Sequence, residues 1–338
     1  MGTNKTFIIA EAGANHNRIK SQAFKLIDVA VNSSADAVKF QTYSSDTLYS
    51  KYTPDFAGYN DITKLIRDIE LPRSWHENLK LYCDDSGIEF MSTPFDEKAV
   101  DELYNLGVKR FKISGFEATD PRLVKYIAST QLPLIISLGI GTNLYTMDKI
   151  RAWISEVDGN SNITFLHCNN AYPTPHKDIN LGQMVSMIDY MNTNDVQIGL
   201  SDHTEGILTS PVAVSLGAQV IEKHYTINRN LPGPDHLFAI EPSELIEMIN
   251  NIRLVETMLR IKDIKYTESE QGFSMARRSV ITKVDLKVGD ILTEDNITTK
   301  RPLLDDSIPA IEYYNMLGKK VNVNLKNDEI IKWTMIND

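Results

Sequence analysis

The sequence has few of the features that would direct a protein to a membrane or an oxidising compartment. Only two of its 338 residues are cysteine, Cys83 and Cys168, so no disulfide framework is expected and a cytoplasmic location is predicted. No apolar run approaches the ~20 residues that a membrane span needs. The chain enters a strand pattern at Phe7 without the apolar stretch of a signal peptide.

Basic residues are also fewer than acidic residues. Lysine and arginine number 35 against 45 for aspartate and glutamate, and the resulting formal net charge of −10 argues against nucleic acid or an anionic membrane as a partner. This charge does not exclude an anionic small molecule, because a few lysines can dominate a pocket inside an acidic protein.

The first 260 residues instead contain eight short apolar runs that alternate with helical patterns. Eight βα units predict a (β/α)8 barrel, an α/β fold, over residues 1–260. Nearly every run ends in a polar or ionisable residue, which would ring one face of a barrel, whereas an open sheet would gather such residues at one switch point. The runs expected to form strands are Phe7–Glu11, Ala37–Gln41, Glu89–Thr93, Arg110–Ile113, Leu134–Ser137, Thr164–His167, Gln197–Asp202 and Val220–His224.

The pattern changes after this region. Residues 261–276 form a polar stretch that is typical of a linker. Residues 277–338 predict a second, small β-rich domain, with short runs separated by turn-forming residues. The expected strands there are Arg278–Val284, Asp290–Ile297, Lys319–Asn324 and Ile330–Trp333.

Two histidines stand at the ends of the last two predicted barrel strands. His203 and His224 are accompanied by Asp202 and Glu222. A single such histidine is usually a buried residue that donates to a backbone carbonyl, and that interpretation stays open here. Two of them at the active-site end of a barrel favour a site for Mn²⁺, Mg²⁺, Co²⁺ or Zn²⁺, because neutral imidazoles with nearby carboxylates suit these ions.

Two lysines, Lys39 and Lys112, lie near the ends of other predicted strands. One lysine in such a place commonly extends to solvent. Two at the same end of a barrel favour a cradle for an anion, and a Schiff-base lysine is the competing functional interpretation.

Further polar residues follow other strands. Glu11 ends the first strand and is either a structural carboxylate or a general acid or base. Proline-rich loops follow the sixth and eighth strands, and they would hold Asn170, Tyr172 and Asp235 over the barrel mouth.

Together these motifs resemble the sialic acid synthase family. The similarity runs through the whole chain in order, and residues 276–279 and 299–302 resemble the antifreeze-like (SAF) domain that the family carries after its barrel. The motifs that carry it in the barrel are Ile9–His16, Val38–Thr42, Ser92–Phe95, Leu166–Cys168, Tyr172–Pro175, Gly199–Thr204, Glu222–His224 and Pro232–Asp235.

The resemblance implies an activity and a set of partners. The family condenses phosphoenolpyruvate with an N-acylated mannosamine-type sugar to give a nine-carbon 2-keto-3-deoxy acid and phosphate. It uses Mn²⁺, or Mg²⁺ or Co²⁺, and works as a homodimer in which the SAF domain of one subunit is exchanged to cover the barrel of the other.

The resemblance also implies roles for individual residues. His203 and His224 would bind the metal, and Glu11 and Glu222 would serve proton transfer and water activation. Phosphoenolpyruvate would contact Lys39, Thr93, Lys112, Ser137, Asn170 and Ser201, and the sugar would contact Gln41, Tyr172, Asp235 and Arg301 of the partner subunit.

Two other functions remain open from the residues alone. One is a barrel aldolase or isomerase that uses a Schiff-base lysine or a metal-bound hydroxyaldehyde. The other is a sugar-binding protein whose C-terminal domain performs the recognition without chemistry. The two histidines and two lysines at one barrel end weigh against a mere binding module.

Overall fold

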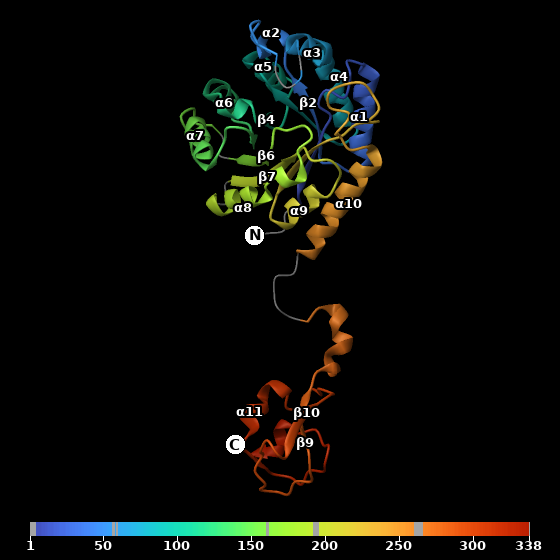
Figure 1. The fold of residues 1–338 in the computed structure, drawn as a ribbon, viewed down its shortest axis with the longest axis vertical. Coiled ribbons are helices and arrows are strands. Elements are labelled where there is room, and N and C mark those ends of the chain that lie inside the picture. The colour runs from blue at the N-terminus through green and yellow to red at the C-terminus, as the bar shows by residue number, and fades with distance from the viewer. Residues whose placement is uncertain are drawn as a thin grey trace. The chain divides into compact units, whose positions relative to one another are not determined.

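The structure is a computed structural model that describes residues 5–55, 58, 60–159, 162–191, 196–259 and 266–337. The chain divides into two compact units, Met1–Ile261 and Lys262–Asp338, each of which is described by itself (Figure 1). No helix in the described ranges combines the length and the apolar character that crossing a bilayer requires.

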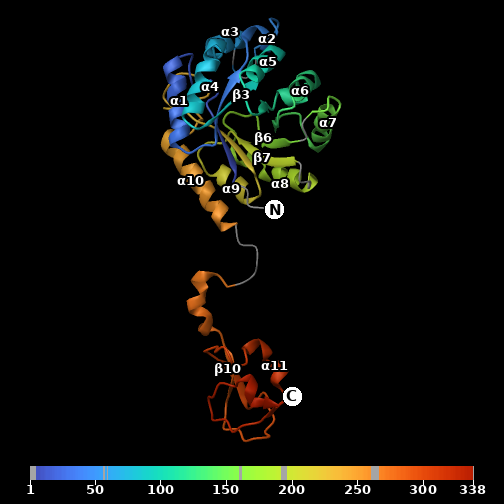
Figure 2. The same cartoon turned by 180° about the vertical axis from the view of Figure 1, so that it is seen from behind.

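The first unit is a parallel barrel surrounded by helices, as Figures 1 and 2 show from opposite sides. Its sheet has the order β3-β2-β1-β8-β7-β6-β5-β4, and β3 and β4, at the two ends of this order, lie side by side. The predicted (β/α)8 fold is confirmed, and each of the eight strands predicted for the barrel begins and ends within one residue of an observed strand. The strands are β1 (Phe7–Glu11), β2 (Ala37–Thr42), β3 (Glu89–Pro94), β4 (Phe111–Ile113), β5 (Leu134–Leu138), β6 (Ile163–Cys168), β7 (Val196–Asp202) and β8 (Val220–His224).

Helices connect the strands, and several begin at residues suited to capping. The Asp96 side chain accepts from the Ala99 N–H, and Asp120 caps a helix that has Pro121 at its first position. The helices of this unit are α1 (Lys20–Asn32), α2 (Ser45–Leu48), α3 (Ile62–Ile69), α4 (His76–Asp85), α5 (Glu97–Asn105), α6 (Pro121–Ala128), α7 (Leu144–Ser155), α8 (Leu181–Tyr190), α9 (Thr209–Ser215) and α10 (Pro242–Met258).

Alternation along the strands decides which side chains enter the barrel. One buried apolar cluster fills its interior, and a separate, larger cluster lies between the strands and the helices. The interior cluster consists of Ile9, Ala37, Met91, Ile135, Leu166 and Val220. Side chains two or four positions further along the same strands therefore also point inward, at the carboxyl ends of the strands.

The second unit contains short strands and little regular structure. Its strands pair antiparallel, β9 (Ser279–Thr282) with β10 (Ile297–Lys300) and β11 (Lys320–Val321) with β12 (Ile336–Asn337). The predicted strands Asp290–Ile297 and Ile330–Trp333 were wrong. Their apolar residues Leu292 and Ile331 are buried in the core of this unit, but the backbone around them makes only isolated bridges.

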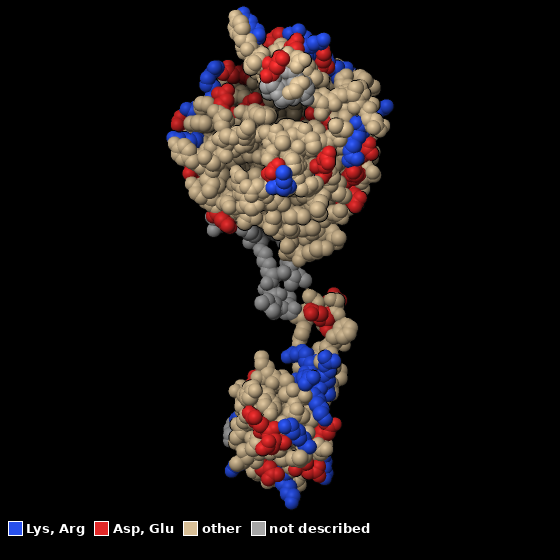
Figure 3. Space-filling model, viewed as in Figure 1, with Lys and Arg blue, Asp and Glu red and all other residues tan. Residues whose placement is uncertain are grey.

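The segment predicted as a linker contains a helix. Residues 261–265 lie outside the described part of the chain, whereas Glu268–Ala276 form the 3₁₀-helix η4, which starts with a capping box between Thr267 and Glu270. Beyond η4, exposed basic side chains gather where the chain enters the rest of this unit (Figure 3). The exposed residues Arg277, Arg278, Lys300 and Arg301 lie there, on and next to β9 and β10.

Candidate active site at the barrel mouth

Nine of the predicted site residues come together at the carboxyl ends of the barrel strands. Each is at most 5% exposed, and their strand positions point them inward, so charged groups occupy the top of an otherwise apolar barrel. These nine residues are Glu11, Lys39, Thr93, Lys112, Ser137, Ser201, His203, Glu222 and His224. Gln41, which is less buried, joins them by donating from Nε2 to Glu11 Oε1 over 2.9 Å.

Lys39 lies between two carboxylates. Its Nζ is 2.8 Å from Glu11 Oε2 and 3.7 Å from Glu222 Oε2, and it donates to Thr93 Oγ1 over 3.0 Å. Burial alone would lower the pKa of Lys39, but the two carboxylates together raise it above its ordinary value. Lys39 is therefore a cation at neutral pH.

The two carboxylates differ in their protonation. Burial raises the pKa of Glu11 to about 7, against the attraction of Lys39. Burial acts in the same direction on Glu222, but Lys112 and Lys39 outweigh it and hold the pKa of Glu222 below its ordinary value. The mouth thus contains one carboxylate that stays charged and one that can exchange a proton near neutral pH.

Lys112 forms a second cationic group beside the first. It donates to Ser137 Oγ over 2.7 Å and to the Ile113 carbonyl over 2.9 Å, and its Nζ is 3.8 Å from Glu222 Oε1. Ser201 donates to the same Glu222 oxygen over 3.1 Å. Burial lowers the pKa of Lys112, and Glu222 acts against that shift. Two ammonium groups with several hydroxyls around them are suited to bind an anion that carries more than one charged group.

The two predicted metal ligands lie next to each other. The ring centroids of His203 and His224 are 5.4 Å apart. His203 Nδ1 is 2.7 Å from the Asn169 carbonyl, which leaves Nε2 for another partner, and His224 Nδ1 is buried without a hydrogen-bond partner. Burial lowers the pKa of His203 to about 4 and that of His224 well below its ordinary value, so both rings are neutral.

These two imidazoles are suited to bind a divalent metal, since an uncharged nitrogen without a partner is the ligand form of histidine. Within the described ranges, no group of three or more His, Cys, Asp or Glu converges as a complete metal site. Two protein ligands would leave the remaining positions to water and substrate.

The predicted loop residues Asn170, Tyr172 and Asp235 lie at the rim of the mouth. The Tyr172 ring packs on His203 with centroids 4.2 Å apart, and Asp235 Oδ2 is 3.9 Å from His224 Nδ1 and accepts from the Ala14 N–H. Gly13 has a φ of +50°, and a Cβ there would stand 2.7 Å from Asp235 Oδ2, so only glycine allows this approach.

Asn170 is held above the ends of β5 and β6. Its Oδ1 accepts from the Ile140 N–H over 2.7 Å, and a Cβ on Gly139 would stand only 1.7 Å from that oxygen. The absence of a side chain at Gly139 therefore makes room for the Asn170 amide. Arg301, the remaining predicted sugar contact, lies in the second unit and is exposed there.

Sequence reasoning missed two contributors to the mouth. Cys168 points inward, with Sγ 3.9 Å from His203 Nδ1, and strand alternation from Leu166 could have found it. Phe238 packs on His224 at 5.2 Å from an irregular loop that no periodicity identifies. Asp202, in contrast, points outward and pairs with Lys223 at 3.1 Å, so it does not belong to the site.

Comparison with known proteins gives a match for each of the two units. The NeuB family model matches residues 26–263, and the SAF domain model matches residues 277–337. The N,N'-diacetyllegionaminic acid synthase of Campylobacter jejuni is 38% identical, over 97% of this chain and 99% of that protein. The N-acetylneuraminate-9-phosphate synthase of Homo sapiens is 31% identical, over 100% and 94%.

A solved structure extends the similarity to three dimensions. The N-acetylneuraminic acid synthetase of Leptospira borgpetersenii serovar Hardjo-bovis, crystallised with citrate, superposes with a TM-score of 0.73. It is 29% identical, and the match covers 80% of this chain and 91% of that one. With the barrel, the SAF unit and the synthase relatives all in agreement, the chain belongs to the NeuB family of nonulosonic acid synthases.

Proposed function

We propose that this protein condenses phosphoenolpyruvate with an open-chain N-acylated mannosamine-type sugar, and releases a nine-carbon 2-keto-3-deoxy acid and phosphate. The observation that carries the proposal is the buried arrangement of two lysines, two carboxylates and two neutral histidines at the barrel mouth. The relatives named as legionaminic acid and N-acetylneuraminate-9-phosphate synthases support the same class of reaction.

The anionic substrate fits the cationic half of the mouth. Lys39 and Lys112 would neutralise the carboxylate and phosphate of phosphoenolpyruvate. Thr93, Ser137 and Ser201 would add hydrogen bonds from their hydroxyls, and the Asn170 amide would do so from the rim. Because the lysines are already placed by Glu11, Glu222 and Ser137, little reorganisation is needed when the substrate binds.

His203 and His224 would hold Mn²⁺, with Mg²⁺ or Co²⁺ as alternatives. When bound, such an ion polarises the aldehyde oxygen of the sugar as a Lewis acid. The side chains of Gln41, Tyr172 and Asp235, which surround the same opening, would orient the sugar.

The reaction balances with water as the third reactant. C3 of phosphoenolpyruvate forms a bond to the aldehyde carbon of the sugar, and the aldehyde oxygen takes up a proton. Water adds at C2 and gives up a proton to a carboxylate of the mouth. The C2–O bond to phosphate then breaks, and the departing phosphate takes the proton of the C2 hydroxyl, which leaves the keto group. Glu11, whose pKa of about 7 allows it to take and return a proton, is the residue proposed for this transfer, while the charged Glu222 holds both lysines in place.

This assignment predicts a pH dependence. If Glu11 acts as the base, only its ionised form is active, so kcat should rise with pH through about 7 and level off above it. Glu11→Gln should lose most of the rate and also this rise, as measured by phosphate release between pH 5.5 and 9. A residual rate in the variant that still rises through the same pH would assign the ionisation to another group.

A lid from a second subunit is part of the proposal. We propose a homodimer in which the SAF domain of one chain covers the barrel of the other and brings Arg301 of the partner subunit to the N-acyl group of the sugar. Size-exclusion chromatography with light scattering tests the dimer, and a monomer that is active at nanomolar concentration would contradict it.

Arg301→Ala is expected to raise the KM for the sugar about tenfold while the KM for phosphoenolpyruvate changes little, because only sugar binding is lost. Arg278→Ala is the matched control, since Arg278 is also exposed at the same end of the unit and donates to the Thr299 carbonyl. Equal effects of Arg301→Ala on the two KM values would remove Arg301 from the sugar site.

The direct test is phosphate release from phosphoenolpyruvate with Mn²⁺ against a panel of sugars. The panel contains N-acetylmannosamine, its 6-phosphate and diacetamido-trideoxy sugars. Release that requires one of these sugars and stops on chelation supports the proposal. A folded, metal-loaded protein that is silent with all of them contradicts it for these sugars.

The aldolase alternative rests on one observation, the lowered pKa of Lys112, since a neutral lysine is the form that attacks a carbonyl. Borohydride treatment with pyruvate would trap a covalent adduct on Lys112 if that chemistry occurred. Metal-dependent release of phosphate without such an adduct is the result expected from the condensation.

A further inference from the structure

The chain between β2 and α4 contains a segment, residues 43–70, that has a small apolar cluster of its own. We call it the α2–α3 segment. Within its described residues, three buried side chains form this cluster, apart from the core that lies between the barrel strands and their helices. They are Tyr43, Ile62 and Ile66. Because this cluster is small, apolar packing holds the segment less firmly than it holds the helices of the barrel.

One end of the α2–α3 segment lies next to the barrel mouth. The segment begins two residues after Gln41, which donates to Glu11 in the mouth. Tyr43 packs edge to face on Phe95 with ring centroids 5.5 Å apart, and Phe95 follows Thr93 by two residues. A displacement of the segment would therefore also displace the strand end that carries Gln41.

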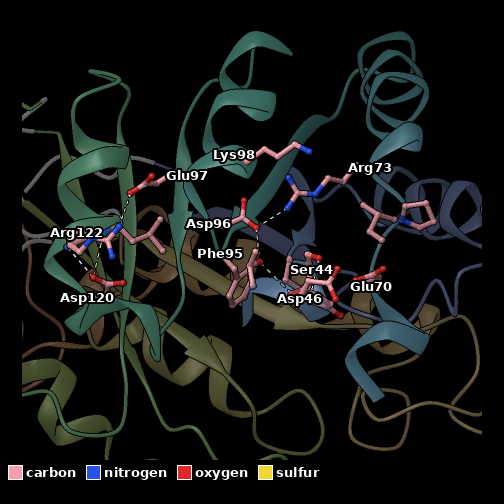
Figure 4. A pocket seen from close by; sticks show the side chains of 15 residues that line it. Ser44, Asp46, Glu70, Arg73, Phe95, Asp96, Glu97, Lys98, Asp120 and Arg122 are labelled. Atoms are coloured by element: carbon pink, nitrogen blue, oxygen red, sulfur yellow. Dashed lines mark hydrogen bonds and ion pairs between the residues drawn. The ribbon is translucent and has the colours of Figure 1, made fainter. Parts of the chain in front are cut away.

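A cavity adjoins both ends of the α2–α3 segment. It measures about 750 Å³, and its lining includes Ser44, Asp46 and Glu70 from the segment, together with residues that follow β3 and η2 (Glu117–Thr119). Figure 4 shows Glu70 beside Ser44 and Asp46 in this lining. Where the segment faces the cavity, close packing does not fix its position, so polar contacts at its ends have a larger part in placing it.

Arg18, in the loop between β1 and α1, provides such a contact. Its Nη1 donates to the Arg67 carbonyl and is 3.7 Å from Glu70 Oε1. Both acceptors lie at the C-terminal end of α3, where carbonyls lack donors within the helix and a cation is favoured by the helix dipole. Glu70 Oε2 also accepts from the Ser45 N–H over 3.0 Å. Arg18 therefore contacts the residue that joins the end of α3 to the start of α2.

The backbone of Arg18 has an unusual conformation for arginine. Its φ is +53°, and that of Asn17 is +48°, in the left-handed region that favours glycine. The loop is held in place from the mouth, because the Ala14 N–H donates to Asp235 Oδ2 over 3.1 Å, and by the Arg18 N–H, which donates to His16 Nδ1 over 3.0 Å. Arg18 thus extends from a loop that is fixed at the mouth towards the α2–α3 segment.

The simpler interpretation of Arg18 is a surface ion pair without consequence. Its side chain is 40% exposed, and exposed ion pairs usually contribute little to stability. Two observations favour a larger role. The guanidinium has two acceptors at one helix end, and arginine occupies a backbone conformation that is unfavourable for it, which is typical of residues that serve a function.

We propose that Arg18 is a positioning residue that ties the α2–α3 segment to the loop between β1 and α1, and thereby keeps Gln41 in place to orient the sugar. The part that concerns the sugar rests on the proposed function, whereas the contact between Arg18 and α3 does not. Removal of the Arg18 side chain should loosen α2 and α3 and weaken sugar binding, while the lysines and histidines of the mouth keep their places.

Hydrogen exchange of backbone amides, measured by mass spectrometry on the full-length protein, tests the contact without any substrate. In Arg18→Gly the amides of α2 and α3 should exchange about tenfold faster than in the wild type, while those of β1, β7 and β8 keep their rates. Glycine suits the φ of this position, so the variant removes the side chain without disturbing the loop. Arg18→Asn, which also tolerates a left-handed φ, should give the same result and serves if the glycine variant does not fold.

Two matched controls separate this contact from general effects of the substitution. Arg110→Ala removes another arginine of similar exposure, 30%, which pairs with Glu89 at the amino ends of β3 and β4. Asp158→Gly places glycine at another exposed residue with a left-handed φ, +51°. Neither control should change the exchange of α2 and α3.

A double-mutant cycle tests the connection to Gln41. With the sugar that supports phosphate release, Arg18→Gly should raise the sugar KM about fivefold and leave the KM for phosphoenolpyruvate within about twofold of the wild type. In a protein that already carries Gln41→Ala, Arg18→Gly should raise the sugar KM by no more than about twofold, because the group that it positions is absent.

Unchanged exchange of α2 and α3 in Arg18→Gly, or an equal increase in either control, overturns the inference. The same holds for a cycle in which Arg18→Gly and Gln41→Ala act independently on the sugar KM. If the wild type releases no phosphate with any sugar, the proposed condensation is wrong, and faster exchange in Arg18→Gly but not in the controls still supports the contact between Arg18 and α3.

Discussion

His224→Ala is expected to lower kcat on the order of a thousandfold or more, while the protein stays folded. The variant removes one of two neutral imidazoles whose rings lie 5.4 Å apart, and it would leave the proposed divalent ion with one histidine ligand. In the proposed reaction a bound ion would polarise the aldehyde, and such polarisation is worth several kcal/mol of transition-state stabilisation, which is the basis of the expected loss. Phosphate release and bound metal per subunit are the measurements.

The control for His224→Ala is His167→Gln. His167 is also a buried histidine on a barrel strand, but its ring points outward and its Nε2 is 2.6 Å from the Ile179 carbonyl. The His167→Gln variant is expected to lose stability, but to bind as much metal as the wild type and to keep most of its rate of phosphate release. Chelation of the wild type should reproduce the His224→Ala effect. Full activity after chelation, or equal loss in the His167→Gln control, would refute the metal role.

Lys39→Met should have the second largest effect, on both activity and stability. The substitution leaves Glu11 and Glu222 buried without the cation between them, and removing one partner of buried charges costs about 3–5 kcal/mol. In the proposed site phosphoenolpyruvate would lose one of its two ammonium groups, so kcat/KM should fall at least about a hundredfold. Chemical denaturation and phosphate release are the measurements.

The stability loss in Lys39→Met should depend on pH in a defined direction. Without Lys39, the carboxylates bind protons more readily in the folded state than in the unfolded chain. Folded-state pKa values that lie above the unfolded ones confer stability at low pH, which is lost as the pH rises through them. The free energy of unfolding of the variant should therefore be closest to that of the wild type near pH 5 and furthest below it near pH 8.

Two further variants distinguish the contribution of the Lys39 charge to catalysis from its contribution to stability. Lys223→Met removes another lysine that is 1% exposed, but one that pairs with Asp202 outside the barrel interior. It should cost comparable stability and keep kcat within about tenfold of the wild type. Lys39→Met combined with Glu11→Gln should recover stability without recovering activity. Recovery of both would show that Lys39 acts only by neutralising Glu11.

The barrel and most of its mouth were predictable because period-two alternation and strand ends are local properties. The inward directions of Lys39, Lys112 and His224 follow from this alternation, and each of the three lies within three residues of the end of its strand. The outward direction of Asp202 follows from the same alternation, although proximity to His203 had associated it with the site. The cavity lined by Tyr43, Asp46, Glu70 and Phe95 was not predictable, because part of its lining lies on α2 and directly after α3, whose short patterns did not stand out from the sequence.

The loops and the second unit were harder to predict from the sequence, because the residues that matter there lie outside regular strands and helices. Phe238 reaches His224 from an irregular segment, and the Asn169 carbonyl orients His203 through a backbone atom that every residue type possesses. In the second unit, buried residues such as Leu292 lie on turns, so an apolar run there does not mark a strand.

The alternation of β7 and β8 also limits how this site can change during evolution. Inward His203, Glu222 and His224 alternate with outward Asp202 and Lys223, whose ion pair is anchored by Ser210 on α9 and by the Thr204 carbonyl. Insertion of one residue in β8 would turn Lys223 into the reaction space and bury Glu222 and His224 against helices. New specificities in this scaffold are therefore accessible through substitutions and changes in loop length, whereas the lengths of these two strands are fixed.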